Sequence, residues 1–293
     1  MLEVLRRAGT TGGDDRPLLL PKTSWVLALA IPRWSAEWLD VEFQPTVLER
    51  LNAIQGHCIA LVKLQDNVVD SHLYVSEAER KRSAALFLPF ANRFYQDLMT
   101  LVSESSPFWA HLSRLYAEQA EATEWQIRTL AGHAGYDIAQ IPRLLANKAA
   151  ILRWPGPALA VLSGQEALAE RIDQSLAQLF LVLQLLDDLA DINEDAASGQ
   201  PNAVLLYAGY REESGAPTMA TILRGIAAVA QLCNSTLDAL NASRVHPRTH
   251  LGAFVSYVTE FARQQLEHAR ERAELRQLYI LLNLAAIRRG ATT

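Results

Sequence analysis

The chain has 293 residues, half of them apolar, and a formal net charge of −5. It is long enough to bury a substantial core, but it lacks the basic surplus with which nucleic-acid-binding proteins neutralise phosphates. Its two cysteines are too few for a disulfide framework, and its longest apolar runs are too short to cross a bilayer. We therefore expect no nucleic-acid partner and no transmembrane segment.

Residues 1–44 are predicted to form a less regular N-terminal arm that packs on the rest of the chain. Several prolines and tryptophans interrupt this region, so we expect an extended arm or short helices there. Charged residues near the start break up any apolar leader. A cytoplasmic protein is expected on this basis, and a homodimer is left open.

Residues 45–293 are predicted to form one all-α domain, a single large antiparallel helical bundle. Ala, Leu, Glu, Gln and Arg dominate, alternating β-branched residues are absent, and the stops fall at Gly and Pro. The expected helices span residues 46–72, 77–103, 108–132, 139–150, 157–163, 166–195, 218–241 and 249–288. The expected N-caps are Asp137, Thr218 and Thr249.

The first predicted helix ends on an acidic pair. Asp66-Asn67-Val-Val-Asp70 sets two carboxylates about one helical turn apart, directly after an apolar segment. Such a pair alone is weak support for a metal site, because acidic residues also occur on solvated helix faces. Farther along the chain, Lys148 lies in the predicted helix 139–150, with Arg143 and Arg153 on either side of it in the sequence.

The predicted helix 166–195 ends on five carboxylates within nine residues. Asp187, Asp191 and Asp195 follow one another at four-residue steps, so they lie on one stripe of a helix. Each like-charged pair at this spacing costs about 0.2–0.5 kcal/mol. A hard cation such as Mg²⁺, which prefers oxygen ligands, would remove this repulsion. The alternative is a solvated helix end whose charges bind nothing.

Together these motifs resemble those of the class I isoprenoid synthases, the superfamily of trans-prenyl diphosphate synthases and class I terpene cyclases. The segment from Gln184 to Asp191 is similar to the second aspartate-rich motif, Q-x-x-D-D-x-x-D, and includes Asp188. The segment from Asp66 to Asp70 resembles the first motif, D-D-x-x-D, with Asn67 in place of its second Asp. Asn147-Lys148 is similar to the segment in which prenyl synthases place a diphosphate-binding lysine.

The resemblance implies an isoprenoid synthase type of bundle that binds Mg²⁺ and a prenyl diphosphate. It implies metal ligands at Asp66, Asp70, Asp187, Asp191 and Asp195, and it places Asp188 among the catalytic acids. Lys148 is the implied diphosphate-binding residue, and we expect Arg143 and Arg153, which flank it, to complete a basic wall opposite the acids.

Three departures from the chain-elongating members favour cyclisation. Those members carry an early Gly-Gly-Lys-Arg element, an Arg-Arg-Gly stretch after the first motif and a Gly-Lys pair after the second. This chain has acidic residues after Gly13, no Gly in its later basic run at residues 80–82, and Gln200 in place of the last Lys. Each loss weakens the binding of a second diphosphate.

The expected function is therefore that of a Mg²⁺-dependent terpene cyclase that ionises farnesyl or geranylgeranyl diphosphate. The alternative is a prenyltransferase that joins a prenyl diphosphate to isopentenyl diphosphate or another acceptor. A non-catalytic homologous subunit is a third hypothesis. A di-iron carboxylate bundle is disfavoured, because no Glu is followed three residues later by His.

Overall fold

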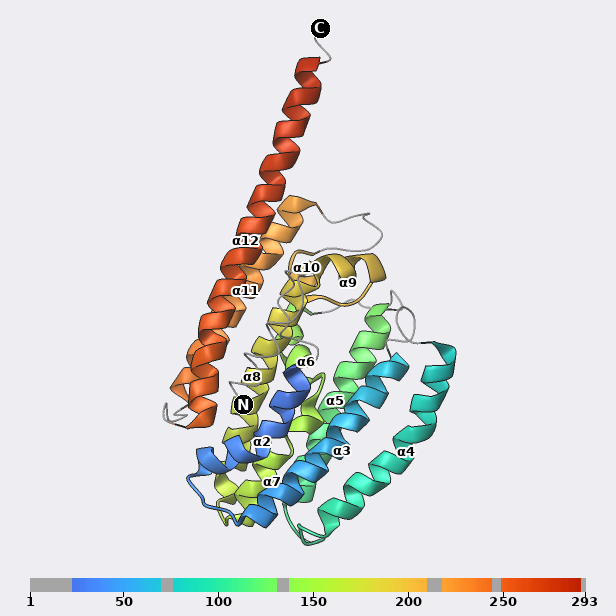
Figure 1. Ribbon diagram of the computed structural model, residues 1–293, viewed down its shortest axis with the longest axis vertical. Coiled ribbons are helices and arrows are strands. Elements are labelled where there is room, and N and C mark those ends of the chain that lie inside the picture. Colours follow the sequence, from blue (N-terminus) through green and yellow to red (C-terminus); the bar gives the residue numbers. More distant parts are fainter. Residues whose placement is uncertain (1–22, 70–75, 131–136, 210–217, 244–248, 291–293) are drawn as a thin grey trace. The chain divides into compact units, whose positions relative to one another are not determined.

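The computed structural model describes residues 23–69, 76–130, 137–209, 218–243 and 249–290, apart from the side chains of residues 23–26, 130, 198 and 273–290. Every regular element in these ranges is helical (Figure 1), which confirms the predicted all-α class. The α-helices are α2 (Thr23–Leu39), α3 (Pro45–Val69), α4 (Glu77–Met99), α5 (Phe108–Leu130), α6 (Ile141–Asn147), α7 (Pro155–Leu162), α8 (Ala169–Ala190), α9 (Ile192–Ser198), α10 (Ala203–Tyr207), α11 (Met219–Ala242) and α12 (His250–Gly290). Three short 3₁₀ helices are η1 (Ile138–Gln140), η2 (Ala150–Arg153) and η3 (Glu166–Leu168).

The chain divides into two compact units. The first comprises residues 1–120, 147–177 and 248–251, and the second comprises residues 121–146, 178–247 and 252–293. The region predicted as one domain, residues 45–293, therefore contributes to both units. The helices α5, α6, α8 and α12 each contain residues of both units.

In the predicted N-terminal arm, the described part is a regular helix rather than an extended chain. α2 runs for 17 residues with Pro32 inside it. Its buried side chains include Leu27, Ile31 and Trp34, and it packs on α3 and α7. A proline inside a helix removes one backbone hydrogen bond, so burial of this apolar face has to offset that loss.

Within the first unit, α3 packs against α4 in antiparallel orientation (Figure 1). Near the start of α3, Arg50 donates to the hydroxyl of Thr100, just after the end of α4, at 2.5 Å. Near the end of α3, Asn67 donates to the hydroxyl of Ser83, near the start of α4, at 3.2 Å. The two helices are thus tied by polar contacts at both ends.

The core of the first unit contains an aromatic cluster. Phe94, Phe108 and Trp154 are fully buried, and Trp154 meets both phenylalanine rings edge to face at centroid distances of 5.8 and 6.3 Å. Cys58 in this unit and Cys233 in the second unit are both buried, free cysteines. Burial raises the pKa of both thiols.

Two of the predicted N-caps are confirmed by side-chain hydrogen bonds. Asp137 accepts from the backbone N–H of Ala139 at 3.0 Å, and Thr218 accepts from that of Thr221 at 3.2 Å. Thr249 directly precedes α12. These contacts place the helix starts at the residues that the sequence predicts.

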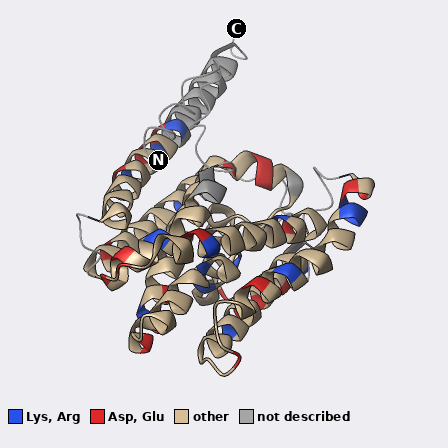
Figure 2. Ribbon diagram, turned by 60° about the horizontal axis from the view of Figure 1, so that its bottom comes forward, with Lys and Arg blue, Asp and Glu red and all other residues tan. Residues whose placement is uncertain are grey.

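Charged residues of both signs are interspersed along the described helices (Figure 2). Among the helices in the described ranges, none has the length and apolar character that a bilayer crossing requires.

In the second unit, α10 and α11 come into backbone contact at Gly225. A methyl group on this residue would lie 2.0 Å from the backbone oxygen of Val204. The close approach therefore requires glycine at this position of α11.

Gly225→Ala should accordingly lower the free energy of unfolding by about 3 kcal/mol or more, because the added methyl group meets backbone that cannot move aside. Gly56→Ala is the matched control, since nothing lies within 4 Å of the position of its added methyl group in α3. That change should stabilise the protein by about 0.5–1 kcal/mol. Urea unfolding monitored by circular dichroism measures both, and equal effects would contradict the close approach.

Candidate functional site

The structure places the sequence-predicted site residues in both units. The first unit contains Asp66, Lys148 and Arg153, and the second contains Arg143, Asp187, Asp188, Asp191 and Asp195. Asp70 lies outside the described residues, as do the segment after Gly13 and residues 71–75.

The acidic stripe of the second motif lies where α8 gives way to α9. The apolar residues before it, such as Leu185 and Leu186, are buried, whereas Asp187 and Asp191 are half-buried. The helix breaks at Asp191, whose backbone φ and ψ are −102° and 12°. The backbone N–H of Asp191 still bonds to the carbonyl of Asp187 at 3.0 Å, and that of Asp195 to the carbonyl of Asp191 at 2.9 Å. The one-turn spacing of the three acids therefore continues across the break.

Asp188 faces away from water and accepts hydrogen bonds from within its own unit. Its side chain is only 3% exposed. Its carboxylate accepts from the backbone N–H of Ala203 at 2.7 Å and from the side-chain amide of Gln184 at 2.7 Å. The first bond satisfies one of the unpaired N–H groups at the start of α10.

Asn202 joins the residues before and after the break in the helix. Its amide nitrogen donates to the backbone oxygen of Asp188 at 2.6 Å and to the carboxylate of Asp195 at 2.8 Å. Its amide oxygen accepts from the N–H of Val204 at 2.9 Å, so Asn202 is also the N-cap of α10. We call Gln184, Asp188, Asp195 and Asn202 the α8–α10 latch.

The first motif occupies the end of α3, where Asp66 is half-buried. The amide of the neighbouring Asn67 donates to the hydroxyl of Ser83 on α4. Gln65 accepts from the amide of Gln119 on α5 at 2.7 Å. Both neighbours of Asp66 therefore fix the end of α3 to adjacent helices.

Lys148 lies in the turn between α6 and η2 and is half-buried. The backbone N–H of Ile151, three residues later, donates to the amide oxygen of Gln119 at 3.1 Å. Gln119 thus connects the Lys148 segment with the end of α3. Among the described residues, the Lys148 ammonium group makes no hydrogen bond or ion pair, so it has no acidic partner there.

The two arginines predicted to flank Lys148 both have carboxylate partners. Arg143 forms a bidentate pair with Glu121 at 2.5 and 2.6 Å, with both side chains about half exposed. The hydrogen bonds from Arg143 lower the pKa of Glu121. Arg153 is only 1% exposed, and it pairs with Asp173 at 3.1 Å and with Glu118.

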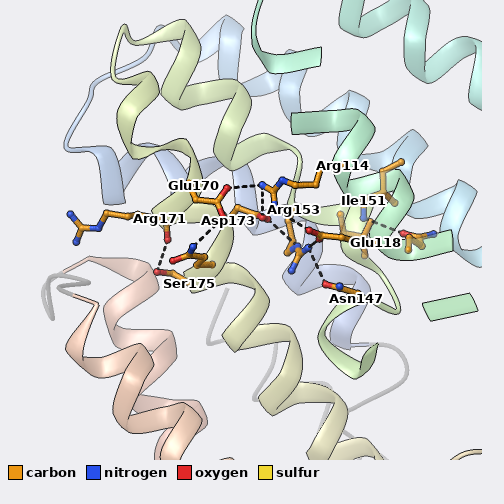
Figure 3. Close-up of polar contacts among 12 residues, drawn as sticks. Arg114, Glu118, Asn147, Ile151, Arg153, Glu170, Arg171, Asp173 and Ser175 are labelled. Atoms are coloured by element: carbon orange, nitrogen blue, oxygen red, sulfur yellow. Dashed lines mark hydrogen bonds and ion pairs between the residues drawn. The ribbon is translucent and has the colours of Figure 1, made fainter. Parts of the chain in front are cut away.

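The Arg153 pairs belong to a buried charge network (Figure 3). Arg153 also donates to the side chain of Asn147, next to Lys148, at 3.2 Å. Arg114 binds Glu118 at 2.9 Å and Asp173 at 3.0 Å. Burial raises the pKa of Asp173, and the two arginines oppose that shift. The network links α5, η2 and α8 within the first unit.

These partners were not predicted from the sequence. Glu118 and Asp173 lie 35 and 20 residues from Arg153, with no repeated spacing to connect them. Asn202 carried a weak signal, because it precedes the apolar run Ala-Val-Leu-Leu-Tyr and Asn is a favoured N-cap residue.

The donor set of the acidic stripe is chemically suited to Mg²⁺, because it consists of carboxylate oxygens. Within the described ranges, no three His, Cys, Asp or Glu side chains gather into a group that could hold a metal ion. Comparison with protein-family models, curated proteins and solved structures finds no match to this chain. Family membership and Mg²⁺ binding therefore stay predictions.

The charge network yields a stability prediction. Arg153→Ala should destabilise the protein by about 3–5 kcal/mol, because it leaves the buried Asp173 without one of its two cations. Removing that cation raises the pKa of Asp173 further above its unfolded value. The folded variant then binds more protons than the unfolded chain, so its stability deficit should shrink as the pH falls from 7 towards the raised pKa.

The matched control is Arg143→Ala, which breaks an exposed pair and should cost no more than about 1 kcal/mol. Urea unfolding of both variants at a series of pH values measures these effects. A deficit for Arg153→Ala that is small, or that grows with acidification, would contradict the buried network.

Proposed function

We propose that this chain is a Mg²⁺-dependent terpene cyclase with a helical bundle of the class I isoprenoid synthase type. The observation that carries the proposal is the acidic stripe at the end of α8. Asp187 and Asp191 keep a one-turn spacing across the helix break and are half-buried after an apolar run. Like-charged side chains one helical turn apart repel one another, and a bound cation would remove that repulsion.

In this proposal, the carboxylates of Asp187 and Asp191 would bind Mg²⁺ in the second unit. The resemblance in sequence assigns the same role to Asp66 and Asp70. The metal ions would supply the positive charge that binds the diphosphate and stabilises it as it leaves. Lys148 would add a further positive charge. The absence of a carboxylate partner for its ammonium group among the described residues supports this role.

The chemistry starts with cleavage of the allylic carbon–oxygen bond. The bonding electrons leave with the diphosphate, whose negative charge bound Mg²⁺ and the Lys148 ammonium group would offset. The allylic cation is then attacked by one of its own double bonds. It ends as a hydrocarbon by losing a proton, or as an alcohol by taking up water. An apolar environment is needed to exclude water until cyclisation is complete.

The segment after α9 favours cyclisation over chain elongation. Elongating members place a Gly-Lys pair there, whereas this chain has Gly199 and Gln200. Asn202, two residues later, is occupied by hydrogen bonds to α8 and α9. The segment thus serves the internal structure of the second unit and lacks the lysine that would bind a second diphosphate.

The substrate experiment tests the proposal directly. We expect farnesyl or geranylgeranyl diphosphate with Mg²⁺ to yield diphosphate and a product extractable into organic solvent. Incubation with C10, C15 and C20 substrates, each with and without radiolabelled isopentenyl diphosphate, separates the alternatives. Label in a longer prenyl diphosphate would establish the prenyltransferase. Release of diphosphate without a hydrocarbon or alcohol would indicate transfer to another acceptor, and no turnover at all would favour a non-catalytic subunit.

Substitutions at the stripe and at Lys148 give a further prediction. Asp187→Asn and Asp191→Asn should each slow diphosphate release at least about 100-fold and leave the helical circular dichroism unchanged. Lys148→Ala should slow release and weaken the binding of inorganic diphosphate. The matched controls are Asp238→Asn on α11 and Lys63→Ala on α3, because both side chains are exposed. Full activity in the Asp187 and Asp191 variants would contradict the magnesium site.

A further inference from the structure

Asp188 is the second residue of the aspartate-rich motif. Hydrogen-bond donors of the protein itself already bind both of its carboxylate oxygens. One carboxylate oxygen accepts from the N–H of Ala203 and the other from the amide of Gln184, both at 2.7 Å. Hydrogen bonds to a carboxylate at this distance are strong. If Asp188 turned to bind a metal ion, it would leave a buried backbone N–H without an acceptor.

Asn202 adds a further hydrogen bond between the start of α10 and the end of α8. Its amide bonds the backbone of Asp188, before the helix break, and the side chain of Asp195, after it. Asp191 lies at the break itself. A single side chain thus spans the point at which α8 and α9 change direction, and it constrains the angle between the turn that carries Asp187 and the turn that begins at Asp191.

We infer that Asp188 and Asn202 are positioning residues, which hold α10 against α8 so that Asp187 and Asp191 present their carboxylates together. This inference rests on the proposed function, because it assigns the binding of Mg²⁺ and diphosphate to Asp187 and Asp191. It removes Asp188 from the acids that touch the metal ion, and it gives Asp195 a partner in Asn202.

The first motif offers an independent parallel. Asn67 also occupies the second position of its motif, and its amide bonds Ser83, a buried residue of the next helix. In each motif the second residue therefore fastens its helix to a later element of the same unit. The acid that precedes it, Asp66 or Asp187, is less buried than Asp188.

Exchanging the amide and the carboxylate between positions 184 and 188 tests whether position 188 needs a carboxylate or only its hydrogen bonds. We call the double variant Gln184→Glu with Asp188→Asn the inverted pair. Asp188→Asn alone should break the α8–α10 latch. The asparagine side chain has one acceptor oxygen, whereas two donors, the N–H of Ala203 and the amide of Gln184, each need an acceptor. Adding Gln184→Glu restores complementarity. The Asn oxygen can accept from Ala203, and the Asn amide can donate to the new Glu. Outer hydrogen-bonding partners of metal ligands typically contribute about 10- to 100-fold to affinity or activity.

The measurement is the rise in melting temperature caused by Mg²⁺ with inorganic diphosphate, titrated to give an apparent affinity. We expect Asp188→Asn alone to weaken that affinity about 10- to 100-fold and the inverted pair to recover most of it. Gln174→Ala is the matched control. Gln174 also lies on α8, and its amide donates to a carboxylate one helical turn away, that of the exposed Glu170. It should leave the affinity unchanged.

Asn202→Ser provides a second variant that keeps every carboxylate of the motif. Serine can still cap α10, but it lacks the amide that bridges Asp188 and Asp195. We expect about a tenfold loss of affinity for Mg²⁺ with diphosphate. This variant decides the question if the inverted pair fails to fold.

The outcomes separate the inference from the proposed function. No shift with Mg²⁺ and diphosphate in the unaltered protein would overturn the proposed function and this inference with it. A shift in the unaltered protein that is absent from a folded inverted pair would overturn the inference alone, because the carboxylate itself would then be required. Unchanged affinity in Asn202→Ser would also overturn the inference alone.

Discussion

A carboxylate that is removed from water must find hydrogen-bond donors inside the chain, and each compact unit contains such a group. Asp173 in the first unit is matched by two arginines, whereas Asp188 in the second is matched by a backbone N–H and an amide. Both contacts hold segments that carry candidate site residues. The Asp173 network reaches the turn before Lys148 through Arg153, and Asp188 lies within the acidic stripe itself.

The helices could be predicted because their apolar periodicity and their stop signals agree, and the observed α3, α4, α5 and α11 lie within a few residues of the expected ranges. The exceptions have physical causes. Pro32 indicated irregular structure, but burial of the apolar residues of α2 outweighs the hydrogen bond that a proline removes. The break at Asp191 was not expected, because the bonds that span it come from Asn202, eleven residues later.

For the candidate site, the sequence indicated which residues to consider, but it did not indicate which ion-pair partners they have. The acidic stripe stands out by its spacing, and Lys148 was singled out by the resemblance of its segment to that of prenyl synthases. Nothing in the spacing indicates that Arg153 is enclosed by Glu118 and Asp173, since these residues come together only through the packing of three elements. Arg143 and Arg153 look alike in the sequence. One forms an exposed pair and the other a buried one, so their contributions to stability differ although their chemistry is the same.

Asp188 and Asn67 make hydrogen bonds of opposite direction to their partners. The start of α10 presents an N–H group, which only an acceptor oxygen can meet, and Asp188 supplies one. Ser83 on α4 presents a hydroxyl group, which an amide can bond without adding a second negative charge beside Asp66. Asn67 therefore meets the requirement at its position with less electrostatic repulsion than an aspartate would create. The contact with α4 therefore gives Asn67 a structural role of its own beside Asp66.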